Sequence, residues 1–294
     1  MFVKRRGMNL FKKVLIPVNE GMDVSVAIKK ALELKDHDTP LCIHFLICNY
    51  RNTLYKYFSY FKSGKFEKID DHTKSFPEHF YYIKKEIYRQ SDNCSIVIDI
   101  LNRKNISRGV INYIKEHEID LLLFCKKRLR DPAIFLKRMD FNKIAGQSSC
   151  ATLSVTPGSL NHSVKSIILP VGSFLPERKI EIAVAFAQKY NALIHLVTLL
   201  DDADSSHSKK KVDIFYKTYK ILKDCGYPPQ YKILPKYESH EILLRYAEQV
   251  NADLILLNPQ ENSIIPRIND NSVVDFISPL SHLLVLMTKP NMVV

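Results

Sequence analysis

The most prominent group of residues that could do chemistry is a run of six basic side chains within 13 residues. They are Lys126, Lys127, Arg128, Arg130, Lys137 and Arg138. Guanidinium and ammonium groups at this density can bind an anion or an acidic partner through charge-assisted hydrogen bonds. The interpretation we favour is that these long side chains extend into solvent and bind nothing specific. Specific nucleic-acid binding is not expected, because aromatic residues are not interleaved with the cations and no known nucleic-acid-binding module is present.

The histidines form a second candidate group. His44 and His195 occupy equivalent positions in two similar apolar segments, which predicts hydrogen-bonded histidines within a sheet rather than metal ligands. No histidines have the H-E-x-x-H spacing of a zinc site, so no metal is expected. Two acidic triplets centred on His37 and His117 are predicted to be solvated charges at helix ends. The sequence also lacks a G-x-S-x-G elbow, a Walker loop and a Rossmann glycine set, so we expect no enzymatic activity.

The elements that position these residues occur twice, with a period of about 150 residues. Each half opens with a short apolar strand ending in Pro-Val, followed by a segment with helical periodicity and then by the histidine-bearing strand. A further strand and helix lead to an Asp, Asp120 or Asp253, that stands directly before a continuous apolar run. Such runs are typical of strands buried on both faces of a parallel sheet. The final strands are predicted at 151–155 and 283–287.

Alternation of strand and helix predicts an α/β fold with two tandem, doubly wound, five-stranded parallel sheets. We expect one domain at 1–157 and a second at 164–294, joined by a polar, turn-rich linker at 158–163. The first domain carries a variable insertion at 51–90, in which Pro77–Tyr88 is predicted to be helical.

Charge is distributed unevenly between the halves. Residues 1–157 hold 28 Lys and Arg against 17 Asp and Glu, whereas residues 158–294 hold 15 against 14. The basic first half can attract anions or an acidic protein, although a merely solvated surface is the simpler interpretation. No apolar run is long enough to span a membrane, and six cysteines without a C-x-x-C pair predict reduced thiols in a cytoplasmic protein.

In their order and spacing, these repeated segments resemble the universal stress protein family, and the resemblance covers nearly the whole chain. The family pattern includes an opening strand ending in Val-Asp and an Ala-Asp-Leu-Ile strand. A G-x-x-G-(nine residues)-G-Ser/Thr loop then cradles the phosphates of ATP. The resemblance implies Rossmann-like domains with ligands at the carboxyl ends of the strands, where strand order reverses. It also implies that the strands at 151–155 and 283–287 pair within the chain as a pseudo-dimer, and whether whole chains dimerise further stays open.

The resemblance locates the phosphate loop, but this loop has lost its glycines. The first half has Cys125, Arg128 and Arg138 at the three glycines and Met139 at the Ser/Thr. The second half has Asn258, Glu261, Asn271 and Ser272 at the same four positions. Asn19 and Gly172 replace the aspartate that contacts the nucleoside. Side chains at these positions would fill the space of the phosphates, and Glu261 would add a like charge.

We therefore expect a non-catalytic binding or regulatory protein of the universal stress protein type that does not bind ATP in the usual family mode. Two alternatives remain. One is a stress-response protein that binds ATP or AMP through an altered loop. The other is a scaffold that binds a small anion or an acidic partner through the basic loop 126–138.

Overall fold

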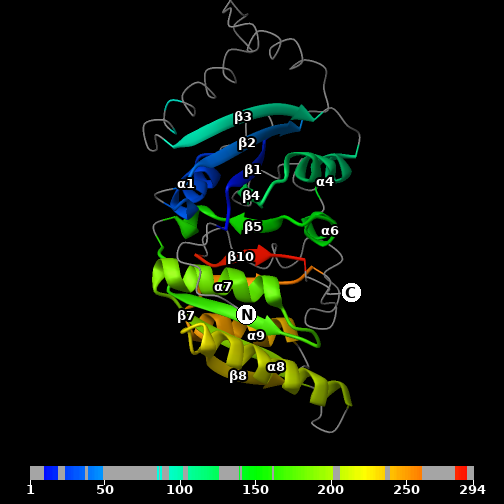
Figure 1. The fold of residues 1–294 in the computed structure, drawn as a ribbon, viewed down its shortest axis with the longest axis vertical. Coiled ribbons are helices and arrows are strands. Elements are labelled where there is room, and N and C mark those ends of the chain that lie inside the picture. Colours follow the sequence, from blue (N-terminus) through cyan, green and yellow to red (C-terminus); the bar gives the residue numbers. More distant parts are fainter. Residues whose placement is uncertain are drawn as a thin grey trace, which may run out of the picture.

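In the part of the chain that the structure describes, ten strands form one continuous sheet (Figure 1). The computed structural model describes residues 10–18, 24–36, 39–48, 85, 87, 93–101, 105–125, 139, 141–160, 162–200, 206–235, 239–259 and 282–289. The strand order is β3-β2-β1-β4-β5-β10-β9-β6-β7-β8, so each half contributes five neighbouring strands with the same relative order. Among the described strands, every pairing within a half is parallel, and only the central β5–β10 pairing is antiparallel.

The elements match the predicted repeat closely. In the first half they are β1 Lys13–Val18, α1 Ser25–Leu34, β2 Leu41–Cys48, β3 Cys94–Leu101, α4 Ile106–His117, β4 Leu121–Cys125, α6 Phe141–Gln147 and β5 Ala151–Val155. In the second half they are β6 Ser166–Val171, α7 Glu177–Tyr190, β7 Leu193–Leu200, α8 Ser206–Asp224, β8 Gln230–Pro235, α9 Ser239–Gln249, β9 Leu254–Leu257 and β10 Leu284–Met287. The α/β class and the pairing of the two final strands within the chain are confirmed. The two expected sheets are joined into one, because this pairing covers the inner edge of each half.

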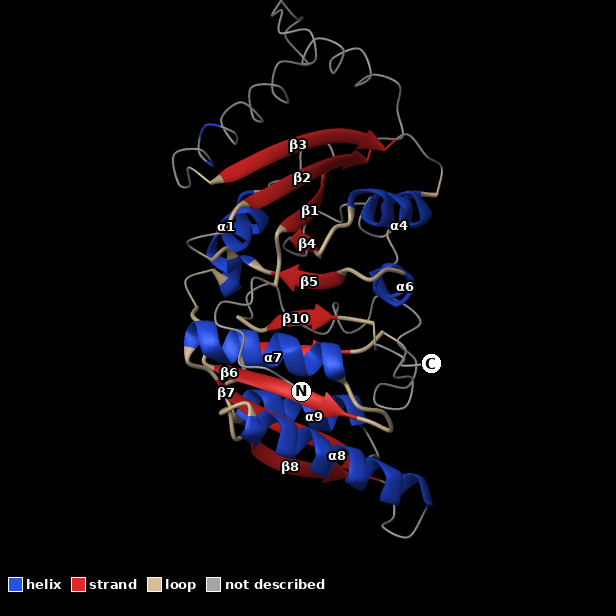
Figure 2. Cartoon of the chain, in the orientation of Figure 1, coloured by secondary structure: helices blue, strands red, loops and turns tan. Residues whose placement is uncertain are grey.

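Helices cover both faces of the sheet (Figure 2). Buried residues of α1, α7 and α8 pack with one face, and those of α4, α6 and α9 pack with the other. The central strands are apolar on both sides for this reason, which explains their continuous hydrophobic runs. Gly109 lets α4 approach β3 closely, because a Cβ at this position would lie 2.7 Å from Cδ1 of Leu101.

The segment that connects the halves is more ordered than a polar linker. Residues Pro157–Ser159 form a 3₁₀ turn (η1), in which Ser159 Oγ donates a hydrogen bond of 2.7 Å to the carbonyl of Thr156. Ser159 is buried and its own carbonyl accepts a hydrogen bond from Lys30 of α1. The expected helix Pro77–Tyr88 lies outside the described residues apart from Lys85 and Ile87, which are helical.

Asp120 and Asp253 hold the central strands together in the same way in both halves. Oδ2 of Asp120 accepts hydrogen bonds from the backbone N–H groups of Lys12 and Lys13, both at 2.9 Å. Oδ2 of Asp253 accepts those of Lys165 and Ser166 at 2.7 and 3.0 Å. The Asp that stands directly before each continuous apolar run is therefore a structural residue that connects the start of β4 to β1, or of β9 to β6.

Replacing Asp253 by alanine should lower the free energy of unfolding by about 2 kcal/mol, because two N–H groups lose a charged acceptor and one of them is buried. Urea unfolding followed by circular dichroism measures this. Asp213, an exposed aspartate on α8, supplies the matched control, and Asp213→Ala should change the free energy of unfolding by less than about 0.5 kcal/mol. Equal effects of the two substitutions would contradict the assigned role of Asp253.

Candidate functional site

Strand order reverses between β1 and β4 in the first half and between β6 and β9 in the second. The carboxyl ends of these strands are the places where doubly wound sheets bind ligands. Because β5 and β10 are antiparallel, the two candidate crevices open at opposite edges of the sheet. The structure describes Met139, Gly172, Asn258 and the backbone of Cys125. The remaining predicted positions lie outside the described residues, and they are Asn19, Lys126, Lys127, Arg128, Arg130, Lys137, Arg138, Glu261, Asn271 and Ser272.

In the first half, Met139 is the informative residue. Its side chain is completely buried and belongs to the same apolar cluster as Phe124 of β4 and Ile144 of α6. The resemblance assigns a phosphate-binding hydroxyl to this position. The thioether of Met139 offers no hydrogen-bond donor, and its surroundings are apolar. This position has become part of the hydrophobic core.

In the second half, Gly172 and Asn258 directly follow β6 and β9, so they lie at the same edge of the sheet. Asn258 is only 8% exposed, and among the residues that the structure describes neither its Nδ2 nor its Oδ1 has a hydrogen-bond partner. A buried amide without partners costs free energy, so this side chain could accept and donate hydrogen bonds to a polar ligand or to water. Helix α6 of the first half packs against this region, because a Cβ at Gly146 would lie 3.8 Å from Cγ of Pro259.

Lys179 of α7 adds a buried cation at the carboxyl end of β6. Its ammonium donates a hydrogen bond of 2.6 Å to the carbonyl of Pro170, and the residue is 1% exposed. Sequence reasoning missed Lys179, because a lysine near the start of an amphipathic helix is ordinarily solvated.

His44 and His195 are hydrogen-bonded sheet histidines, as the repeat predicts. Nδ1 of His44 lies 3.0 Å from the hydroxyl of Tyr113, and Nδ1 of His195 lies 3.1 Å from that of Tyr246. Burial lowers the pKa of both imidazoles, and that of His44 falls to about 4 with a further contribution from the charge on His117.

In the first half, the His44–Tyr113 hydrogen bond is part of a chain of polar contacts that joins four side chains: Cys42, His44, Tyr113 and Asp99. The Tyr113 hydroxyl donates to Oδ2 of Asp99 at 2.6 Å, so it must accept the proton of His44 Nδ1. Nε2 of His44 is then an acceptor, and it lies 3.4 Å from Sγ of Cys42. This order of nucleophile, imidazole and orienting group is found in cysteine enzymes.

Burial lowers the pKa of His44 to about 4, so its imidazole is a weak base near neutral pH. A weak base activates a neighbouring thiol poorly. The chain of hydrogen bonds fixes the orientation of α4 against β2 and β3. His117 also differs from expectation, because its ring stacks on Tyr113 at 4.1 Å between ring centroids, whereas Glu116 and Glu118 are exposed as expected.

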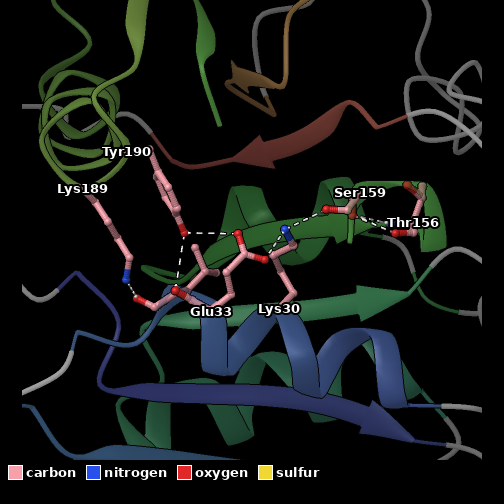
Figure 3. A network of polar contacts seen from close by, with 7 residues as sticks. Lys30, Glu33, Thr156, Ser159, Lys189 and Tyr190 are labelled. Atoms are coloured by element: carbon pink, nitrogen blue, oxygen red, sulfur yellow. Dashed lines mark hydrogen bonds and ion pairs between the residues drawn. The ribbon is translucent and has the colours of Figure 1, made fainter. Parts of the chain in front are cut away.

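A polar network connects α1 with η1 and α7, at the junction between the halves (Figure 3). Nζ of Lys30 lies 2.9 Å from the carbonyl of Ser159 and 2.6 Å from Oε2 of Glu33. The Tyr190 hydroxyl lies 3.4 Å from Oε1 of Glu33. Lys189 caps the carboxyl end of α1, since its ammonium donates to the carbonyls of Leu34 and Lys35 at 2.9 and 2.8 Å.

The described part of the chain holds no candidate for a metal site, a disulfide or a membrane-spanning helix. No three His, Cys, Asp or Glu side chains there are placed to hold a metal ion. Five cysteine side chains are described, and none of them forms a disulfide: Cys42, Cys48, Cys94, Cys150 and Cys225. Within the same residues, no helix combines the length and apolar composition that crossing a membrane requires.

Comparison with known proteins gives matches in structure but none in sequence. No protein-family model matches the chain, and no curated protein is significantly similar to it. A universal stress protein from Archaeoglobus fulgidus superimposes with a TM-score of 0.59 at 13% identity, over 95% of this chain and 96% of the other. A structure assigned to the same family from Pseudomonas aeruginosa UCBPP-PA14 gives a TM-score of 0.56 at 14% identity, over 97% and 95%.

A third similar structure is the cytoplasmic domain of a prokaryotic cation chloride cotransporter, with a TM-score of 0.51 at 9% identity, over 94% of this chain and 95% of the other. At these identities the similarity concerns the fold, and it extends over both halves of the chain. The ten-stranded sheet, the two matching halves and these superpositions show that the chain has the fold of a tandem universal stress protein.

Proposed function

We propose that this protein is a non-catalytic binding or regulatory module of the universal stress protein type that does not hold ATP in the usual family mode. The observation that carries the proposal is the complete burial of Met139 in the apolar core, at the position where a hydroxyl would bind phosphate. Cys125 at the end of β4 supports it, because a residue with a Cβ stands where glycine would let backbone approach the phosphates.

The test is a thermal shift with magnesium and ATP, together with acid extraction of the purified protein. A ligand at 100 times its Kd would stabilise the fold by about 2.7 kcal/mol, which a melting curve detects easily. We expect no shift with 1 mM ATP or AMP beyond that given by sodium phosphate at equal ionic strength. We also expect no extracted nucleotide and no phosphate release. A nucleotide-dependent shift would contradict the proposal.

The second candidate function is binding of a nucleotide through an altered loop in the second half, and the buried, unpartnered amide of Asn258 favours it. Purine rings and ribose hydroxyls offer both donors and acceptors, which an amide can pair with simultaneously. Lys179 supplies a cation at the same edge of the sheet.

The variant Asn258→Leu separates the two candidates. If no ligand binds, replacing an unpaired buried amide by an apolar side chain of similar size should leave the free energy of unfolding unchanged or raise it by about 1 kcal/mol. If the second half binds a nucleotide, the wild-type protein should show a thermal shift with ATP or AMP, and Asn258→Leu should abolish that shift.

A further inference from the structure

The two outer strands of the sheet differ in exposure. β3 and β8 are the end strands, and β8 pairs only with β7 among the described strands. Residues 96–100 of β3 are half-buried, whereas all of β8 except Leu234 is exposed. An edge strand directs half of its backbone N–H and C=O groups away from the sheet, so β8 can pair with one more strand.

Apolar side chains flank this open edge. Tyr231 and Ile233, which point to the same face of the sheet, are 63% and 51% exposed. The ring of Tyr231 lies 6.2 Å from that of Phe215 and 6.0 Å from that of Tyr219, which places α8 beside β8. Tyr216 follows Phe215 on α8 and is 66% exposed. Three large side chains are therefore accessible around a strand whose outer edge is unpaired among the described strands, which is unusual for an edge.

Exposed lysines lie on α8 and on β8 near this edge. Lys220 and Lys223 are exposed and lie four and seven residues after Tyr216, so they share its side of α8. Lys232 is exposed on β8 between Tyr231 and Ile233 in sequence, and its side chain points to the opposite face of the sheet from theirs. Asp213 and Asp224 are the exposed acids of α8, against five exposed lysines on that helix. The charge of this region is positive, although the second half as a whole is nearly neutral.

We propose that the β8 edge binds an extended acidic peptide by strand addition. Its backbone pairs with β8, apolar side chains pack against Tyr231, Ile233 and Tyr216, and acidic side chains lie near Lys220, Lys223 and Lys232. Positive charge disfavours a second copy of this chain at the edge, because lysines would face lysines. The unpaired backbone favours a peptide over a nucleic acid or a lipid surface, since neither of these supplies a complementary row of amide groups. The inference does not depend on whether the crevices bind a nucleotide.

The probe is a fluorescein-labelled peptide of ten residues that alternates Glu and Val, titrated with the full chain and followed by fluorescence anisotropy. We expect saturable binding that weakens at least tenfold between 50 and 500 mM NaCl, because charge attracts the peptide. The same peptide with alternate backbone nitrogens methylated cannot complete the pairing, and it should bind at least tenfold more weakly.

Two double variants locate the site. Lys220→Glu with Lys232→Glu should weaken binding at least tenfold. Lys210→Glu with Lys217→Glu makes the same change of charge on the side of α8 away from β8, and it should weaken binding no more than threefold. Melting temperatures of both variants establish that they are folded. Equal losses in the two variants, undiminished binding of the methylated peptide, or no binding at 1 mM protein would each overturn the proposal. The proposal would also be wrong if the wild type bound no peptide but bound oligouridine or phosphatidylserine vesicles, and the first variant lost that binding.

Discussion

Replacing Lys30 by alanine should lower the free energy of unfolding by about 3 kcal/mol. The Lys30 side chain is completely buried, and its ammonium holds both the carbonyl of Ser159 and the carboxylate of Glu33. Without it, Glu33 keeps the Tyr190 hydroxyl but loses its cation, and a carbonyl in the connection between the halves loses its donor. The cost arises mainly on the buried side, where the volume of Lys30 is left empty and the carbonyl of Ser159 loses its donor, because the Glu33 side chain is 31% exposed and can be solvated.

The neighbouring residue supplies a matched control. Lys29 stands on the same helix and is exposed, so Lys29→Ala should change the free energy of unfolding by less than about 0.5 kcal/mol. Lys30→Met keeps most of the buried volume and removes only the charge, and its effect should lie between the other two. Chemical denaturation of the three variants, followed by circular dichroism, gives the comparison. If Lys30→Ala is no more destabilising than Lys29→Ala, the network in Figure 3 does not hold the halves together.

The helices α1 and α7 occupy equivalent places in the two halves but carry different side chains at the junction. Four residues before the end of each helix, α1 has the buried Lys30 and α7 has the buried Phe186. One residue before the end, α1 has Glu33 and α7 has Lys189. One helix therefore offers an anion and the other a cation, which suits pairing of the first half with the second better than pairing of like halves. In a pairing of two first halves, Glu33 would take the place of Lys189, beside the carbonyls of Leu34 and Lys35 and the carboxylate of Asp36.

The sequence predicted the fold well, for a physical reason. Strands buried on both faces must be apolar at successive positions, so segments such as LLLFC at 121–125 and LILL at 254–257 stand out without any structure. Their repetition after Asp120 and Asp253 indicated two equivalent halves. That the last strands pair across the halves followed from the family resemblance, since a short apolar strand carries no information about its partner.

The polar residues were much less predictable. In isolation, Lys30 belongs to an amphipathic helix with two adjacent lysines, and nothing local shows which of them is buried. Its burial depends on Ser159, which is 129 positions away in sequence. Asp99 and Tyr113 come from two other elements, and only the sheet register and the packing of α4 bring them to Cys42 and His44 of β2. Of the predicted ligand positions, Met139 and Asn258 gave structural information, and the basic loop 126–138 stays a prediction.

The stability of the fold should fall as the pH drops from 6.5 towards 4, and His44 should account for about 2 kcal/mol of that fall. Burial lowers its pKa to about 4 in the folded protein, against about 6.5 in an unfolded chain. Between these values the unfolded chain binds a proton that the folded protein does not, so acid favours unfolding. Above pH 6.5 the imidazole is neutral in both states and contributes no pH dependence.

The groups around His44 explain why protonation is resisted. The charges of His117 and Lys13 oppose a positive imidazole, whereas that of Asp99 favours it but is weaker than the effect of burial. Protonation would also place a second donor on Nε2, which faces the thiol of Cys42.

Gln can still donate to the Tyr113 hydroxyl but does not titrate, so His44→Gln should flatten the acid limb of the stability curve by about 2 kcal/mol. Denaturant midpoints between pH 7 and 4.5 measure this, with His162→Gln at an exposed histidine as the control. A curve for His44→Gln parallel to that of the wild type would mean that the pKa of His44 is the same in the folded protein as in the unfolded chain, and that the contacts from Cys42 to Asp99 do not favour a neutral imidazole.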